Sequence, residues 1–397
     1  MDFEKLANKY STPLFAYDFD YIKSRYIKFK EAFSGRKSLI LYAIKANPNL
    51  SVIKALASLG AGADCVSANE IKRAKLAGVD KYKIVFSGVG KSDEEIEFAL
   101  NEDILFINVE SKAELDRVEL CAKKLGKVAR VSFRINPNIN PKTHPYISTG
   151  LHENKFGTEI EEAKELYLRA RDSELLKPVA LHFHIGSQLT ELGPIVEATK
   201  IAYEFLQWCE SEKIDIKILD IGGGLGIRYD NEDEIEPYEY AQSVLEVLKK
   251  EYTIACEPGR YIVGNSGYFI TKVLYEKRND KKRFVIVDGA MNDLIRPSLY
   301  SAFHNIKTLK EGKASLCDVV GPVCESGDFL AKNINLPELS HGDLVIIEST
   351  GAYAMSMASN YNSRLKAAEV ALENGEDRLI RKRDEFDEIV ANEKEYL

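Results

Sequence analysis

Residues 39–48 read Leu-Ile-Leu-Tyr-Ala-Ile-Lys-Ala-Asn-Pro, an apolar run whose one charged residue is Lys45. Hydrophobic residues without polar alternation are typical of a β-strand that is buried on both faces, and the Asn-Pro pair predicts where it ends. A lysine at the carboxyl end of such a strand is costly unless it is paired, loses its charge or is used covalently. Lysines that form Schiff bases need a site of this kind, so Lys45 is the first candidate catalytic residue.

A long alternation of apolar runs and amphipathic segments extends from this strand. The strand-like runs are 39–46, 62–67, 83–88, 104–110, 129–137, 179–186, 216–224 and 253–260. The segments with apolar residues at helical spacing include 50–59, 70–77, 93–100, 113–125, 160–170, 195–209 and 238–249. About eight strand–helix units over about 220 residues predict an α/β fold of the (β/α)₈ or TIM-barrel type, with an open doubly wound sheet as the alternative.

The chain is long enough for more than this barrel, with 397 residues. We expect an N-terminal strand and helix in 1–34, the barrel in 35–267 and a β-rich C-terminal domain, barrel-like or sandwich-like, in 268–397. The N-terminal strand, 12–18, is expected to join the β-rich domain. Asn374-Gly375 between two β-like runs predicts a hairpin, and 384–392 predicts a short terminal helix.

The composition excludes several classes of protein. The chain is 45% hydrophobic and 29% charged, with a net charge of −8, which disfavours a nucleic-acid partner. No apolar run approaches the roughly 18 residues of a membrane helix, and the N-terminus lacks the features of a signal peptide. The six cysteines form no Cys-x-x-Cys pair, and the six histidines show no metal-ligand spacing beyond His182 and His184. We therefore expect a cytoplasmic enzyme that acts on a small molecule, with no metal, nucleic acid or membrane partner.

Active sites of such barrels form at the carboxyl ends of the strands, and these ends carry unusual residues. They are Lys45, Asp64 with Ser67, 184–187 (His-Ile-Gly-Ser), 222–224 (Gly-Gly-Gly) and 257–260 (Glu-Pro-Gly-Arg). Any one of them alone is more often structural than functional. Their shared position at one rim favours a site.

The residue types at this rim indicate a pyridoxal phosphate site. Gly222-Gly223-Gly224 can bring backbone N–H groups close to a phosphate, although a tight turn is an equal alternative. Glu257 can accept a hydrogen bond from the pyridine nitrogen and keep it protonated, which makes the ring a strong electron sink. His184 can stack on the ring, unless it is a satisfied core histidine. Lys45 then holds the cofactor covalently.

Several motifs resemble a known family. They are 42–47 (Tyr-Ala-Ile-Lys-Ala-Asn), 184–188 (His-Ile-Gly-Ser-Gln), 222–224 and 257–260. In this order, followed by a β-rich domain, they resemble the alanine-racemase-fold group of pyridoxal-phosphate decarboxylases, and within it the diaminopimelate decarboxylases. The resemblance covers the chain from about Thr12 to Arg383.

The resemblance implies site residues in both domains. For pyridoxal phosphate it implies Lys45, Asp64, His184, Ser187, Gly223, Gly224, Glu257, Pro258, Gly259, Arg260 and Tyr353. For the substrate it implies Arg260, Arg296, Tyr300, Glu325 and Tyr353, with Cys324 as the proton donor. It also implies a homodimer in which the Cys324 loop enters the partner's active site, and a mobile cover formed by 142–157.

The resemblance implies meso-diaminopimelate as the substrate, with decarboxylation at its D-centre to L-lysine. The charges agree with this, because the distal end of that substrate carries a carboxylate, which Arg260 and Arg296 can bind, and an ammonium, which Glu325 can bind. Without the resemblance, Arg296 would be read as a solvated surface cation and Cys324 as a small buried apolar residue. The alternatives are a decarboxylase for carboxynorspermidine, arginine or ornithine, or a non-catalytic pyridoxal-phosphate-binding relative. Racemase activity is disfavoured by Glu257, because racemases of this fold place an arginine there.

Overall fold

The protein was analysed as a computed structural model that describes residues 1–140 and 155–397. Most of the predicted cover, 142–157, lies outside the described residues. The chain forms two compact units, which are described separately. One comprises 1–22, 228–232 and 262–397, and the other comprises 23–227 and 233–261.

The second unit is a closed barrel of eight strands, and neighbouring strands pair in parallel all the way round. The strands are β2 (Ser38–Ala43), β3 (Gly62–Cys65), β4 (Ile84–Phe86), β5 (Phe106–Val109), β6 (Ala129–Ile135), β7 (Leu176–Phe183), β8 (Ile218–Asp220) and β9 (Thr253–Cys256). The pairing of β2 with β9 closes the ring, so the predicted TIM barrel is confirmed and the open sheet was wrong.

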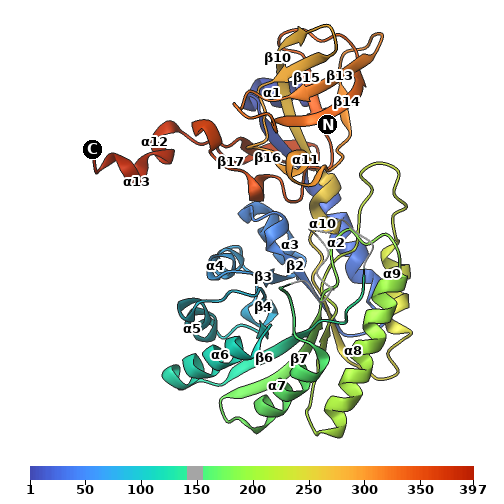
Figure 1. The fold of residues 1–397 in the computed structure, drawn as a ribbon, viewed down its shortest axis with the longest axis vertical. Coiled ribbons are helices and arrows are strands. Elements are labelled where there is room, and N and C mark those ends of the chain that lie inside the picture. The colour runs from blue at the N-terminus through green and yellow to red at the C-terminus, as the bar shows by residue number, and fades with distance from the viewer. Residues whose placement is uncertain (141–154) are drawn as a thin grey trace. The chain divides into compact units, whose positions relative to one another are not determined.

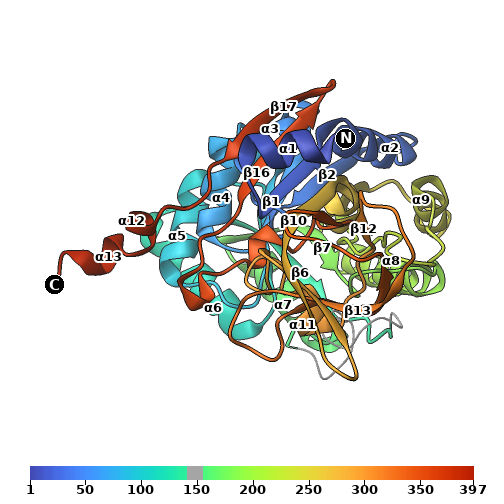
Figure 2. The same cartoon turned by 90° about the horizontal axis from the view of Figure 1, so that it is seen from above.

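Helices follow the strands and lie on the outside of the barrel (Figures 1 and 2). They are α3 (Leu50–Ser58), α4 (Ala68–Leu76), α5 (Asp93–Glu102), α6 (Lys112–Leu125), α7 (Ile160–Asp172), α8 (Gly193–Ser211) and α9 (Pro237–Leu245). Local sequence sets their ends. A capping box of Ser92 and Glu95 begins α5, and Gly126 ends α6 in the left-handed conformation at φ 62°. α2 (Phe19–Ala32) precedes β2.

The β-rich unit holds a nine-stranded sheet whose main path runs β14-β13-β11-β10-β1-β16-β17. Its strands are β1 (Leu14–Asp18), β10 (Gly267–Arg278), β11 (Arg283–Val287), β12 (Ile306–Thr308), β13 (Ser315–Val320), β14 (Phe329–Leu336), β15 (Leu344–Ile347), β16 (Ala368–Glu373) and β17 (Glu376–Arg381). β1 pairs antiparallel with β10 and parallel with β16, so the N-terminal strand lies inside this sheet. The short helices of this unit are α1 (Phe3–Tyr10), α11 (Arg296–Tyr300), α12 (Phe386–Ile389) and α13 (Ala391–Lys394), while α10 (Arg260–Val263) begins in the barrel unit and ends in this one.

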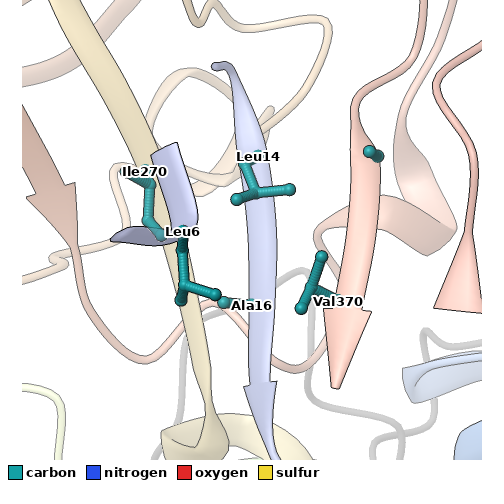
Figure 3. Packing of buried hydrophobic residues seen from close by; sticks show 6 residues of the cluster. Leu6, Leu14, Ala16, Ile270 and Val370 are labelled. Carbon is teal, nitrogen blue, oxygen red and sulfur yellow. The ribbon is translucent and has the colours of Figure 1, made fainter. Parts of the chain in front are cut away.

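An apolar cluster fixes the N-terminus to this sheet (Figure 3). Leu6 of α1 packs against Leu14 and Ala16 of β1, Ile270 of β10 and Val370 of β16, and all five are buried. The cluster joins residues that are hundreds of positions apart in the chain. Burial of such aliphatic side chains contributes about 1.5–3 kcal/mol each to stability.

The turn chemistry of the C-terminal hairpin is as predicted. Asn374 (φ 54°) and Gly375 (φ 80°) both have the positive φ that a tight hairpin between β16 and β17 requires. The short terminal helix predicted over 384–392 is present as two short helices, α12 and α13, which meet at Val390. Within the described ranges, no helix has both the length and the apolar character needed to cross a membrane.

Candidate active site

Lys45 lies just beyond its strand and not at the end of it. β2 stops at Ala43, and Lys45 is in a single 3₁₀ turn, Ile44–Ala46. The Tyr42 hydroxyl donates to the Asn47 carbonyl at 3.0 Å, which fixes the turn. The Lys45 ammonium donates to Asp64 Oδ2 at 2.7 Å, and the lysine side chain remains 39% exposed while that of Asp64 is fully buried. The lysine is thus paired through its ammonium group, while its side chain remains accessible.

Asp64 lies on β3 directly beside Ala43 of β2. Burial and the neighbouring Glu257 charge raise the pKa of this carboxyl, and the Lys45 ammonium opposes that rise. The second rim residue predicted on this strand, Ser67, has a structural role instead. Its hydroxyl accepts the Glu70 N–H at 3.2 Å and caps α4.

Glu257 follows β9 and is only 6% exposed. One carboxylate oxygen, Oε2, lies 3.5 Å from His182 Nε2, while Oε1 accepts no hydrogen bond from any described residue. Burial raises the pKa of Glu257, but its interactions with the His182 imidazole and with the Lys45 ammonium outweigh burial and hold that pKa below its ordinary value. The site therefore contains a buried carboxylate with one oxygen available for a ligand.

His184 follows β7 and is half-buried. Its Nδ1 accepts the Gly223 N–H at 3.2 Å. Burial, with the charges of Arg134 and Lys45, lowers the pKa of His184 well below its ordinary value, so the ring is neutral. A neutral imidazole tied to the glycine turn can present its flat face to an aromatic ligand.

The glycine turn has no room for side chains. A Cβ on Gly222 would lie 2.7 Å from the Phe183 carbonyl oxygen, one on Gly223 would lie 2.2 Å from that of Glu257, and one on Gly224 would lie 2.5 Å from that of Gly186. Gly222 and Gly224 also have positive φ, at 66° and 115°. The glycines therefore satisfy the demands of a tight turn, and because they carry no side chain an anion can approach their backbone closely. The N–H groups of Gly222 and Gly223 already donate to Asp220 and to His184.

The segment after β9 links these parts. Arg260 is the first residue of α10, is 6% exposed, and donates through Nη2 to Ser187 Oγ at 3.1 Å. The Pro258 carbonyl accepts the Ala43 N–H at 3.2 Å. A Cβ on Gly259 would approach Ala46 to 3.0 Å. The structure thus brings the predicted rim residues of the barrel unit together around the Lys45 turn.

The remaining predicted residues belong to the β-rich unit. Arg296 of α11 is buried rather than a solvated surface cation, and its guanidinium lies 5.1 Å from the centre of the Tyr229 ring. Tyr300 ends the same helix. Tyr353 has φ 57°, a left-handed conformation that is rare for a bulky residue and that concentrates at functional sites.

Cys324 and Glu325 lie on an exposed loop. Buried Asp328 accepts the N–H groups of Val323 and Met291, each at 2.7 Å, and so fixes the base of the loop. The Cys324 N–H donates to Asn362 Oδ1 at 2.8 Å. An exposed thiol and carboxylate on a fixed loop are available to another molecule, whereas a buried cysteine would be inert.

Two residues of the barrel site were not predicted as functional. His182 was noted only for its spacing to His184, and Asp220 was taken as part of an apolar strand. Both are buried beside Glu257. A titratable residue at the last or next-to-last position of an otherwise apolar strand was the signal that could have identified them.

The barrel site fits pyridoxal phosphate. It offers an accessible lysine, a buried carboxylate with a free oxygen, a neutral imidazole and a glycine turn without side chains. These are the groups needed to bind an aldehyde, a pyridine nitrogen, an aromatic ring and a phosphate.

Comparison with known proteins gives the same assignment. Residues 19–264 match the family model described as the pyridoxal-dependent decarboxylase, pyridoxal binding domain. The diaminopimelate decarboxylase of Campylobacter jejuni is 54% identical over all of both chains, and that of Helicobacter pylori strain J99 is 55% identical over 98% of this chain and 97% of its own. The crystal structure of the Helicobacter pylori diaminopimelate decarboxylase complexed with L-lysine superposes with a TM-score of 0.97, at 54% identity and full coverage of both chains. This chain belongs to the diaminopimelate decarboxylase family of pyridoxal-dependent decarboxylases.

Proposed function

We propose that the protein removes CO₂ from the D-centre of meso-diaminopimelate and produces L-lysine, the last step of lysine biosynthesis, with pyridoxal phosphate as its cofactor. The observation that carries the proposal is the full-length likeness to a diaminopimelate decarboxylase structure that holds L-lysine. The barrel site supports it independently, because it contains the groups that the cofactor needs.

When bound, pyridoxal phosphate accepts the electron pair that the leaving carboxylate releases. Lys45 would hold the cofactor covalently through Nζ. Asp64, 2.7 Å from Nζ, orients the lysine and can take up a proton from it. Glu257 accepts the pyridine N–H and keeps the ring protonated. His184 stacks on the ring, and the backbone of Gly223 and Gly224 binds the phosphate.

The substrate-binding roles rest on charge. Arg260 and Arg296 bind the distal carboxylate through charge-assisted hydrogen bonds, and Glu325 binds the distal ammonium. The burial of Arg296 supports this role, since a buried guanidinium strengthens its interaction with a carboxylate. Tyr300 and Tyr353 complete the contacts to the substrate, and Tyr353 also contacts the cofactor.

Cys324 returns a proton to the α-carbon, and we propose that it does so in the partner subunit of a homodimer. The exposure of Cys324 and Glu325 supports this arrangement, because both are available to a second chain. All six cysteines are free thiols, five of them buried, which supports a location in the reducing cytoplasm.

A complementation assay tests the shared site. Lys45→Ala and Cys324→Ala chains, each inactive alone, are mixed after dissociation. If each site uses Lys45 from one chain and Cys324 from the other, half of the dimers are mixed and each has one intact site, so about a quarter of wild-type activity returns. If each site lies within one chain, no activity returns and the shared site is wrong.

A substrate panel tests the reaction. Purified protein with pyridoxal phosphate receives meso-, LL- and DD-diaminopimelate, ornithine, arginine and carboxynorspermidine, and CO₂ release is followed with Lys45→Ala as the blank. Release from the meso compound alone, with lysine as product, is the expected result. Release from another substrate would overturn the roles of Arg260, Arg296 and Glu325. No release from any substrate would identify a non-catalytic relative.

A further inference from the structure

A buried polar cluster lies at the carboxyl ends of three neighbouring strands. His182 is on β7, Asp220 ends β8, and Glu257 follows β9. His182 and Asp220 are register partners. The exposed fractions of His182 and Asp220 are 1% and 0%, and that of Glu257 is 6%. One side-chain nitrogen or oxygen atom from each of the three residues lies within 4.8 Å of the other two.

Asp220 has one committed oxygen and one uncommitted oxygen. Oδ1 accepts the Gly222 N–H at 3.0 Å, at the start of the glycine turn. Oδ2 has no hydrogen-bond partner among the residues that the structure describes, and the same holds for Glu257 Oε1. Two buried carboxylates this close cannot both be charged without a large repulsion. One proton between them removes the repulsion and gives each of these oxygens a hydrogen-bond partner, and Glu257 Oε1 keeps a second lone pair for a ligand.

The surroundings decide which acid carries that proton. Burial, and then the charge of Glu257, raise the pKa of Asp220 well above its ordinary value, and Asp64 acts in the same direction. The interactions of Glu257 with the His182 imidazole and with the Lys45 ammonium lower the pKa of Glu257 despite its burial. The other titratable groups that face Asp220, Tyr240 of α9 and Cys256 of β9, have raised pKa values because they are buried, and so they are neutral.

We propose that Asp220 is a positioning residue that stays protonated and donates its O–H to Glu257, so that Glu257 remains a carboxylate oriented toward the pyridine nitrogen. The role of Glu257 toward the cofactor rests on the proposed function. The protonation of Asp220 does not, because it concerns the cofactor-free protein. Asp220 also holds Gly222, so one side chain orients both the acid for the ring and the turn for the phosphate.

Infrared spectroscopy of the cofactor-free protein tests the protonation directly. An Asp220→Asn variant keeps an oxygen for Gly222 and an N–H for Glu257, so it should fold. The wild-type-minus-variant spectrum at pH 8.5 is expected to show the carbonyl stretch of a protonated carboxylic acid. The matched control is Asp293→Asn, which removes a buried acid of pKa about 7 in the other unit and should change that band at pH 6 but not at pH 8.5. Loss of a carboxylate band in the Asp220→Asn difference would overturn the proposal.

Kinetics and cofactor absorbance test the positioning role. Asp220→Ala leaves Glu257 and Gly222 without a partner and should lower kcat by about 5- to 150-fold, with little change in KM. It should also shift the pH dependence of the bound cofactor's absorbance. Asp220→Asn should recover most of both losses, because it restores the donor. Equal defects in the two variants would overturn the positioning role. A wild-type enzyme that is inactive on every substrate but shows the acid band would refute the proposed function and leave the protonation standing.

Discussion

The glycine turn offers the sharpest test of the cofactor site, through Gly223→Ala. The added Cβ would lie 2.2 Å from the Glu257 carbonyl oxygen, whereas ordinary contact begins at 3.4 Å, so the two segments must separate by about 1.2 Å. They cannot separate freely, because the Glu257 N–H also donates to the Gly222 carbonyl at 2.8 Å. The substitution therefore moves the proposed phosphate contact and the proposed pyridine contact together.

The expected cost follows from that displacement. A misplacement of about 1 Å can lower a rate by about 100-fold, and overpacking costs about 1–3 kcal/mol of stability. We expect Gly223→Ala to lower kcat by about 100-fold and to weaken pyridoxal phosphate binding by about tenfold or more, measured by titrating the cofactor-free protein and following visible absorbance.

Gly35→Ala is the matched control. Gly35 lies before β2, at the end of the strand away from Lys45, and it is exposed. A Cβ added there would have no atom within 4 Å. It should bind cofactor and turn over as the wild type does. If Gly223→Ala matches Gly35→Ala within twofold in both measurements, the phosphate contact does not lie at this turn and the reasoning is refuted.

Three further substitutions test the framework, each by urea unfolding of the cofactor-free protein. Burial raises the pKa of Asp293 to about 7, against about 3.9 in an unfolded chain, so its stabilising contribution is complete below about pH 4 and is lost as pH rises to 7. Asp293→Asn should remove up to about 4 kcal/mol of that pH dependence of the free energy of unfolding, and an unchanged pH dependence would contradict this. Glu110→Gln should cost about 3–5 kcal/mol, because it leaves Arg134 buried without its counter-charge, and a cost below 1 kcal/mol would mean that the pair is not buried in solution. Leu14→Ala should cost about 2.7–5 kcal/mol from the cluster of Figure 3, while Leu316→Ala, at an exposed site, should cost far less; equal costs would contradict the packing.

Much of the barrel was predictable because its pattern is strong. Continuous apolar runs are typical of parallel strands covered on both faces, and helical spacing between them was clear. Prediction was less accurate where structure depends on distant contacts. The sequence analysis did not predict helix α1, because its only buried residue is Leu6, whose partners come from both ends of the chain. It did not predict strand β14 either, because this strand ends the main path of its sheet, is partly exposed, and has its apolar alternation broken by Lys332 and Asn333.

The residues of the site also differ in how far local sequence could predict them. Residues at the ends of predicted strands, such as Lys45 and Glu257, could be placed at one rim from topology alone. The burial of Arg296 could not, because nothing in its local sequence distinguishes it from a solvated cation. Asp220 could not either, since its significance depends on Glu257, which is 37 positions later in the chain but next to it in space.

The acids of the barrel interior explain why a third one needs a proton. Asp64 pairs with Lys45 at 2.7 Å, and Glu257 lies 3.5 Å from His182. Among the described residues the neighbouring His182 is paired with Glu257 and not with Asp220, and a buried carboxylate without an ion pair costs several kcal/mol. A barrel selected for stability alone would place an apolar side chain at that position. The Asp220→Asn variant removes the acid and keeps its hydrogen bonds. Without cofactor, its free energy of unfolding should therefore be at least that of the wild type, because the acid serves catalysis and not folding.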